Sequence, residues 1–163
     1  MKEQREWSTT RRSLLLAAGA LAVGAGGGGA EAQTFVRPPA GTADAMQTAI
    51  RKVVGEAEVK KGKVKLDVPP LSENGNTVAC SVEVDSPMTP KDYVKAIHIF
   101  TEKNPQPNVV SVHLGPRAGR AAFATRIRLA DTQTITAIAE LSDGTFWSDS
   151  ADVIITLGAC LED

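Results

Sequence analysis

Residues 78–84 read VACSVEV, in which Val, Cys, Val and Val alternate with Ala, Ser and Glu. Successive side chains of a β-strand point to opposite faces of the sheet, so this alternation predicts a strand with one face against a core. Val78, Cys80, Val82 and Val84 are therefore expected to point inward. The remaining side chains of the segment are expected to point outward.

The same period of two recurs along most of the chain that follows. Residues 93–100 are apolar on both faces, as in a strand that is covered on both sides, and residues 63–68 form one more short run. Pairs such as Asn74-Gly75 and Asp143-Gly144 mark turns. About seven short strands at this spacing predict an all-β, immunoglobulin-like Greek-key β-sandwich over residues 63–157. The other expected inward residues are Val110, Val112, Leu114, Phe123, Thr125, Ile127, Leu129, Ile135, Ala137, Ala139, Val153, Ile155 and Leu157.

A short N-terminal helix is predicted ahead of the sandwich, within a lead-in that spans residues 33–62. From Asp44 to Gly55, apolar residues recur at the three- and four-residue steps of one helix face. Thr42 or Asp44 can cap the start of this helix, and Gly55 can end it.

The first 32 residues have the parts of an export signal: a charged start, an apolar stretch over residues 14–25, and small residues ending at Ala32. The apolar stretch is shorter than the ~20 residues that a membrane-spanning helix needs, so no membrane span is expected. Arg11 and Arg12 stand directly before it, which favours a twin-arginine signal and a periplasmic protein. The alternative is an ordinary secretory signal in which the arginine pair is accidental.

The composition excludes several classes of protein. The chain has 163 residues, with 18 Lys and Arg against 19 Asp and Glu. It lacks the basic excess of a general nucleic-acid binder, so no nucleic-acid partner is expected. Two cysteines exclude a disulfide-rich scaffold. His98 and His113 each stand alone on the strand face opposite the aliphatic set, so neither a metal site nor a catalytic triad is predicted.

Two groups of residues, one of arginines and one of apolar residues, are expected to lie on the protein surface and to take part in binding. Four arginines within twelve residues form either an anion-attracting or partner-docking stripe or simply a solvated face; they are Arg117, Arg120, Arg126 and Arg128. Apolar residues beyond those needed for one core predict a heterodimer with a second β-sandwich, through a sheet face or edge. These residues are Ala96, Phe100, Ile138 and Ile154.

The two cysteines are expected to lie in different environments. Cys80 shares the inward face of its strand with three valines, so it is expected to be an unreactive core residue. Cys160 lies past the last predicted strand, in a tail over residues 158–163 for which Gly158 can act as a backbone pivot. Three alternatives stay open for Cys160: a functional thiol on a mobile end, a disulfide with Cys80, or a cysteine that merely packs.

Seven short stretches carry a family resemblance: LDVPP at 66–70, ENGNTV at 73–78, VDSPMT at 84–89, YVKAIHIF at 93–100, NPQP at 104–107, LGP at 114–116 and IAELSDG at 138–144. In this combination the chain resembles the SoxY family, the sulfur-compound carrier subunits of the bacterial thiosulfate-oxidising (Sox) system. The resemblance covers nearly all of the chain after the export signal.

The resemblance implies a sandwich of immunoglobulin-like type and, in many members, a twin-arginine signal. It also implies a carrier without catalytic residues, working with Sox-type redox and hydrolytic enzymes and paired with a SoxZ-like subunit. SoxY proteins hold sulfur intermediates covalently on one cysteine near the C-terminus, and Cys160 matches that cysteine. No cofactor is expected besides this covalent sulfur adduct.

The tail of this chain departs from the Gly-Gly-Cys-Gly-Gly arm of the family. Ala159, Leu161 and Glu162 replace three of the four glycines, and Asp163 follows them. Leu161 can anchor the tail on an apolar patch, and the two carboxylates disfavour the thiolate and repel anionic adducts. The alternative function is a non-catalytic immunoglobulin-like interaction subunit that carries no sulfur. A weaker alternative is an enzyme with Cys160 as nucleophile, although no base or oxyanion donor can be paired with it.

Overall fold

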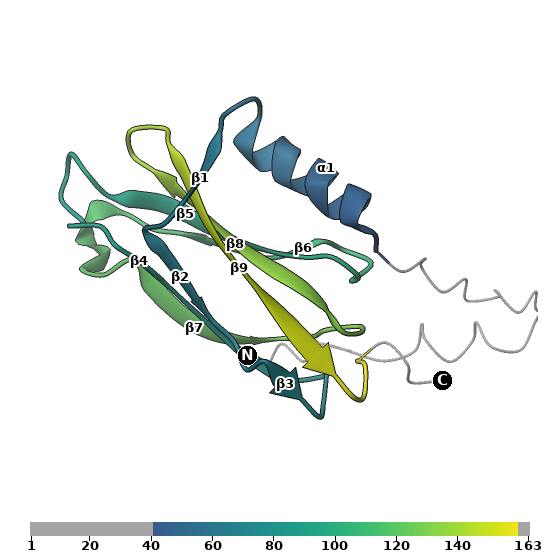
Figure 1. The fold of residues 1–163 in the computed structure, drawn as a ribbon. Helices are drawn as coiled ribbons and strands as arrows, with labels where there is room; N and C mark the ends of the chain where they lie inside the picture. Colours follow the sequence, from purple (N-terminus) through teal and green to yellow (C-terminus); the bar gives the residue numbers. More distant parts are fainter. Residues whose placement is uncertain (1–40, 160–163) are drawn as a thin grey trace, which may run out of the picture. The chain divides into compact units, whose positions relative to one another are not determined.

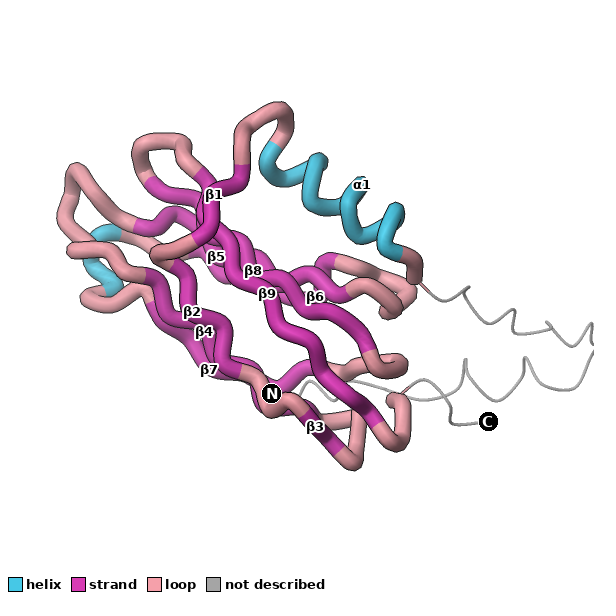
Figure 2. Tube along the Cα trace, in the orientation of Figure 1, coloured by secondary structure: helices cyan, strands magenta, loops and turns pink. Residues whose placement is uncertain are grey.

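Two β-sheets face each other across one core in the computed structural model, which describes residues 41–159 (Figures 1 and 2). The larger sheet has the strand order β1-β9-β8-β5-β6, with β3 added to β9, and the smaller sheet has the order β2-β4-β7. The strands are β1 (Val59–Lys61), β2 (Val64–Asp67), β3 (Leu71–Ser72), β4 (Val78–Val84), β5 (Val94–Thr101), β6 (Asn108–His113), β7 (Ala122–Ile127), β8 (Gln133–Leu141) and β9 (Phe146–Ile155).

The chain changes sheets twice in its second half. From β6 at the edge of the larger sheet it passes through the short 3₁₀ helix η1 (Pro116–Ala118) to β7, which pairs with β4 in the smaller sheet. It then returns to β8, which pairs with β5 and β9. The predicted Greek-key sandwich is therefore confirmed. The edge strand β1, which pairs in parallel with β9, was not predicted and lies in the segment assigned to the lead-in.

The alternation along residues 78–84 has the predicted consequence. Val78, Cys80, Val82 and Val84 are all buried between the sheets, and the residues between them are more exposed. Fully buried residues from the larger sheet, such as Ile97 and Val153, meet them from the opposite side of the core. Burial of this apolar set is the main stabilising contribution to a sandwich of this kind.

Helix α1 (Ala43–Val54) lies over the outer face of the larger sheet (Figure 1). The Thr42 hydroxyl accepts a hydrogen bond from the Ala45 amide at 3.2 Å, which identifies Thr42 as the cap. Gly55 follows the helix at a φ of 61°, a conformation that favours glycine. The helix buries Met46, Ile50 and Val54, one turn apart, in a second apolar cluster with Phe100, Ile138 and Phe146 of the sheet.

Two expectations about apolar residues are wrong. Phe100 and Ile138 do not form a free partner surface, because α1 covers them. Leu157 does not point inward but is 58% exposed, because β9 ends at Ile155 and the strand periodicity ends with it. Ile154 is 55% exposed, in register with the equally exposed Leu71 of β3, so this part of the predicted apolar surface is present.

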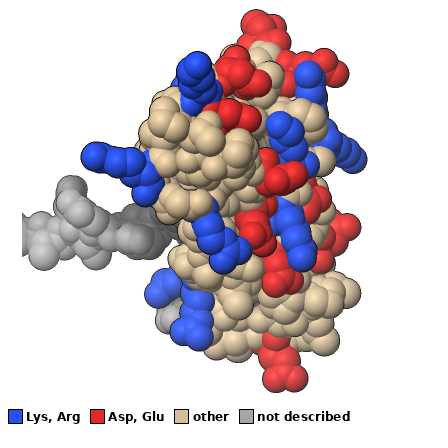
Figure 3. Space-filling model, turned by 90° about the vertical axis from the view of Figure 1, so that its left-hand side faces the viewer, with Lys and Arg blue, Asp and Glu red and all other residues tan. Residues whose placement is uncertain are grey.

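The outer surface carries both signs of charge. On the face shown in Figure 3, Lys and Arg side chains are interspersed with Asp and Glu. Within residues 41–159, no helix is both long and apolar enough to span a bilayer. The predicted export signal, residues 1–32, lies outside the described residues.

Candidate functional site

The segment that leads to Cys160 is tied to two distant parts of the chain. After β9, the Leu157 carbonyl accepts a hydrogen bond from the Gly75 amide at 2.7 Å. The Gly75 carbonyl accepts one from the Leu129 amide at 2.8 Å, and the Leu129 carbonyl accepts one from the Ala159 amide at 2.9 Å. These three bonds, here called the 75–129–159 clamp, anchor the backbone up to Ala159.

Gly75 sits in this clamp because nothing larger fits there. A β-carbon on Gly75 would lie 2.4 Å from the Leu129 carbonyl oxygen and 2.9 Å from the Ala159 nitrogen. The preceding residue fixes the turn, since the Asn74 side chain accepts a hydrogen bond from the Asn76 amide at 2.9 Å. The sequence marks the Asn-Gly pair only as a turn. In the structure, Gly75 of this pair also binds the chain segment that follows β9.

The predicted tail, residues 158–163, is described only in its first two residues. Gly158 is buried, and Ala159 is held by the clamp. The described part of this tail is therefore anchored. The pivot role of Gly158 stays a prediction, and the predicted attachment site, Cys160, lies outside the described residues.

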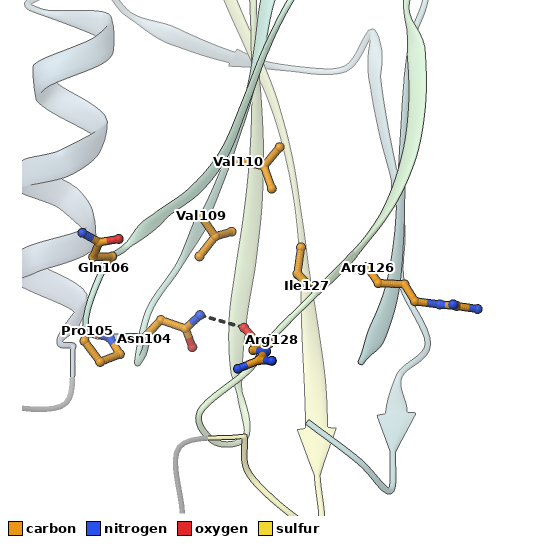
Figure 4. Close-up of a pocket in the computed structure, with 8 residues that line it drawn as sticks. All are labelled: Asn104, Pro105, Gln106, Val109, Val110, Arg126, Ile127 and Arg128. Atoms are coloured by element: carbon orange, nitrogen blue, oxygen red, sulfur yellow. Dashed lines mark hydrogen bonds between the residues drawn. The ribbon is translucent and has the colours of Figure 1, made fainter. Parts of the chain in front are cut away.

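A cavity of about 420 Å³ opens beside the clamp, between the edge strands β6 and β7 (Figure 4). Apolar side chains of both strands line it, and the 104–106 loop and two arginines complete it. Arg128 lies beside Asn104 at one end of the cavity, whereas Arg126 points away from it (Figure 4). The lining residues are Asn104, Pro105, Gln106, Val109, Val110, Arg126, Ile127 and Arg128.

Asn104 connects the cavity to the clamp. Its amide nitrogen donates to the Arg128 carbonyl at 2.8 Å, and its oxygen accepts from the Ala130 amide at 2.9 Å and from Gln133 Nε2 at 3.1 Å. Asn104 is only 8% exposed, so these bonds are made away from water. The loop that holds Leu129 is thus fixed on one side by Asn104 and on the other by Gly75 and Ala159.

Cys80 has the environment that its strand position predicts. It is a free thiol, 2% exposed, within the main core. Burial, followed by the nearby charge of Asp67, raises the pKa of the Cys80 thiol to about 11. Because the thiolate is the reactive form, Cys80 is chemically inert at neutral pH.

The histidines lie together on the outer face of the larger sheet. The His98 and His113 rings are 6.2 Å apart edge to face, and His98 Nδ1 is 2.8 Å from the Ser111 hydroxyl. Burial, followed by the proximity of His113, lowers the pKa of His98. Among residues 41–159, no group of three or more His, Cys, Asp or Glu side chains is placed to hold a metal ion.

The four arginines do not form one stripe. Arg120 pairs with Glu83 at 2.8 Å, near the end of β4, whereas Arg126 is in register with Ala79 near its start. Arg128 lies just beyond β7, and both Arg126 and Arg128 are exposed. Asn104 and Gly75, which organise this region, were not predicted as site residues, because the sequence shows only that each lies in a turn.

Comparison with known proteins gives the family. Residues 50–160 match the model of the sulfur oxidation protein SoxY, and this match ends on Cys160. The chain belongs to the SoxY family. The sulfur carrier protein SoxY from Chlorobium limicola f thiosulfatophilum is 24% identical in sequence, with a TM-score of 0.60 over 71% of this chain and 100% of that one. The resemblance seen in the sequence is therefore confirmed, and the two SoxY proteins share their fold.

Other solved structures are less similar to this SoxY-family chain. The superoxide reductase (neelaredoxin) from Ignicoccus hospitalis is 13% identical, with a TM-score of 0.48 over 58% of this chain and 80% of that one. A putative superoxide reductase from Thermotoga maritima is 18% identical, with the same TM-score of 0.48 over 60% and 87% of the two chains. None of the curated proteins compared with the chain matches it.

Proposed function

We propose that this SoxY-family chain is a periplasmic sulfur carrier that holds sulfur-compound intermediates covalently on Cys160. The observation that carries the proposal is the family match, which extends to Cys160. The clamp supports it, because the described backbone is held firmly up to Ala159, the residue directly before Cys160. Cys80 is no competing attachment point, since its thiol is buried and its pKa is raised.

The chain holds the intermediate, and partner enzymes carry out the redox and hydrolytic steps. Joining a Cys160 thiolate to the outer sulfur of thiosulfate forms one S–S bond and releases two electrons, which a partner redox enzyme accepts. Hydrolysis of the resulting adduct by a second enzyme releases sulfate and leaves a persulfide on the carrier. Neither step needs a catalytic group on this chain.

A second β-sandwich of the SoxZ type is the proposed stable partner. The larger sheet ends in β6, whose outer edge has no neighbouring strand within residues 41–159. Unpaired strand edges offer backbone groups that a partner can cover. The exposed pair of Leu71 and Ile154 provides a separate apolar contact.

Intact-mass measurement of the protein from the periplasm of cells grown on reduced sulfur tests the proposal. The wild-type protein is expected to carry adducts of sulfur or thiosulfate mass, and Cys160→Ser is expected to carry none. Cys80→Ala is the matched control and is expected to carry the same adducts as the wild type. A bare Cys160 thiol under these conditions would indicate an interaction subunit without a sulfur cargo. Turnover of thiosulfate by the purified chain alone would indicate an enzyme.

A further inference from the structure

The two sides of the sandwich differ in whether contacts between the sheets close them. On one side, β1 and β3 both pair with β9, and Asp149 Oδ2 of β9 accepts a hydrogen bond from the Leu66 amide of β2 at 2.9 Å. On the other side, β6 ends the larger sheet and β7 ends the smaller one, and the cavity described above lies between these two edges. This second side, which residues 104–130 form, is here called the open side.

We propose that the open side is a docking surface for an extended, acidic strand of a partner protein. The strand pairs with the free edge of β6, inserts apolar side chains into the cavity and presents a carboxylate to Arg128. The proposal states the chemistry that the second β-sandwich proposed above must carry. Only the identity of that partner rests on the proposed function.

The free edge of β6 offers backbone groups at alternate residues. The Leu114 amide donates to the Lys95 carbonyl at 2.8 Å, in line with the antiparallel register of β5 and β6. In such a ladder, only every second residue turns its amide toward the neighbouring strand. The remaining amides face the open side, where an extended strand can pair with them. The amides that face β5 are those of Val110 and Val112, and those that face the open side are those of Ser111 and His113.

A strand added at this edge would place every second side chain over the cavity. Its inward side chains would continue the inner face of the larger sheet, opposite β7. Val109 and Val110 of β6 line the cavity and are only partly buried, and Ile127 of β7 lines it from the other edge (Figure 4). Apolar side chains of a partner would remove this surface from water, which is the main favourable contribution to such contacts.

The charge of the open side disfavours a second copy and selects an acidic partner. Residues 104–130 contain four arginines and no Asp, Glu or Lys, although the whole chain has a net charge of -1. Arg120 pairs with Glu83 of β4 at 2.8 Å, whereas neither Arg126 nor Arg128 pairs with a carboxylate of the described part of the chain. Two copies joined through their open sides would bring like charges together, which is unfavourable. A carboxylate of a partner would instead neutralise Arg128 at the end of the cavity (Figure 4).

Hydrogen exchange in the presence of a model strand tests the pairing. The probe is the blocked peptide acetyl-ETLTLTE-amide, in which Glu and Leu share one face of the strand and Thr occupies the other. The amides of Ser111 and His113 are expected to exchange fast in the free full chain, and saturating peptide is expected to slow them about tenfold or more. The amides of Val110 and Val112 are the internal control, because they already face β5 and should be protected in both states. Unchanged exchange at Ser111 and His113 overturns the proposal.

The charge requirement is tested with a second peptide and with two variants of the chain. The peptide acetyl-KTLTLTK-amide has the same apolar face and the same backbone, and it is expected to bind about tenfold more weakly because its charges repel the arginines. Arg128→Gln is expected to weaken binding of the acidic peptide about two- to fivefold, as the loss of a partly exposed ion pair does. Arg51→Gln is the matched control, since Arg51 is exposed on α1, away from the open side. Equal affinity for the two peptides, or equal effects of the two variants, overturns the proposal.

Methyl NMR spectra of the full chain show where the acidic peptide lies. Shifts at Val110 and Ile127 are expected, whereas shifts at Leu71 and Ile154 instead would place the peptide on the other apolar surface and overturn the proposal. Protection of the outward β6 amides that grows with protein concentration, without peptide, would show a second copy at this edge and would also overturn it. A missing sulfur adduct, by contrast, would contradict the carrier function and leave the peptide results unaffected.

Discussion

The Ala159 amide donates a hydrogen bond of 2.9 Å to the carbonyl of Leu129, thirty residues earlier in the chain. This bond joins the segment after the last strand to the loop between β7 and β8, and Gly75 bridges the two through its own amide and carbonyl. The backbone before Cys160 is thus set by contacts among three segments that are distant in sequence. Cys160, the proposed attachment point, directly follows a part of the chain with a defined position.

Replacing Gly75 by Ala tests the clamp. The added β-carbon would meet the Leu129 oxygen at 2.4 Å and the Ala159 nitrogen at 2.9 Å, and backbone atoms cannot rotate away as side chains do. We expect Gly75→Ala to lower the free energy of unfolding by about 1–3 kcal/mol, as overpacking does. Urea unfolding measures this, and hydrogen exchange at the Ala159 amide is expected to become faster.

Gly115→Ala is the control for this substitution, because nothing lies within 4 Å of the added β-carbon and the φ of −132° suits any residue. Its stability is expected to stay close to that of the wild type. Equal stability of the two variants would contradict the role given to Gly75.

Asn104→Ala is expected to destabilise the protein by about 2–3 kcal/mol. The substitution removes a side-chain amide that both donates and accepts, and it leaves the Arg128 carbonyl and the Ala130 amide without the hydrogen bonds that Asn104 makes. Asn108→Ala is the control, because that side chain accepts only an exposed bond from Ser111. Thermal unfolding of both variants checks the prediction, and a loss of less than about 0.5 kcal/mol for Asn104→Ala would contradict it.

A bulky thiol reagent is expected to label Cys160 quickly and Cys80 only after unfolding. Cys80 is 2% exposed, and burial and Asp67 hold its pKa near 11, so both access and the thiolate are lacking. Cys80→Ala should lower stability by about 1 kcal/mol through lost packing, and Cys160→Ala should leave it unchanged. Mass spectrometry after timed labelling measures both sites. Equal labelling, or a disulfide between the two cysteines, would contradict this assignment.

Stability is expected to fall as the pH drops from about 7 to 5, in part through His98. Burial and the neighbouring His113 lower the pKa of His98 below its ordinary value of 6.5 in the folded state. The unfolded chain therefore binds a proton first, so the contribution of His98 is fully present above pH 6.5 and is lost as the pH falls through the lowered pKa. Urea unfolding at several pH values measures the slope. His98→Gln should flatten it more than His113→Gln, and an unchanged slope would refute the assignment.

Export by the twin-arginine route is expected to depend on Arg11 and Arg12. Changing both to Lys preserves the charge but removes the pair that stands directly before the apolar stretch of the signal. Periplasmic accumulation of the protein, measured by cell fractionation and immunoblotting, is expected to be abolished. Normal accumulation of the double-Lys protein would show that the general secretory route is sufficient.

The sequence by itself determined the sandwich, the inward set of β4 and the buried face of α1. Each of these depends on a local period, two for a strand and 3.6 for a helix, which neighbouring residues fix without reference to the rest of the chain. The same period of two wrongly predicts that Leu157 points inward, because the end of a strand depends on where the neighbouring strands stop pairing with it. It also could not show that α1 uses Phe100 and Ile138 for its own packing.

Only the tertiary structure decided how the chain before Cys160 is held. Gly75, Asn104 and Leu129 lie in three different turns, and no sequence pattern relates them to Ala159. Their hydrogen bonds arise because the two sheets bring the ends of β4, β5, β7 and β9 together at one end of the sandwich. The same packing separates Arg120, paired with Glu83, from Arg128 beside the cavity, although the two are close in sequence. Contacts between residues distant in sequence depend on the whole arrangement of strands, which no local pattern specifies.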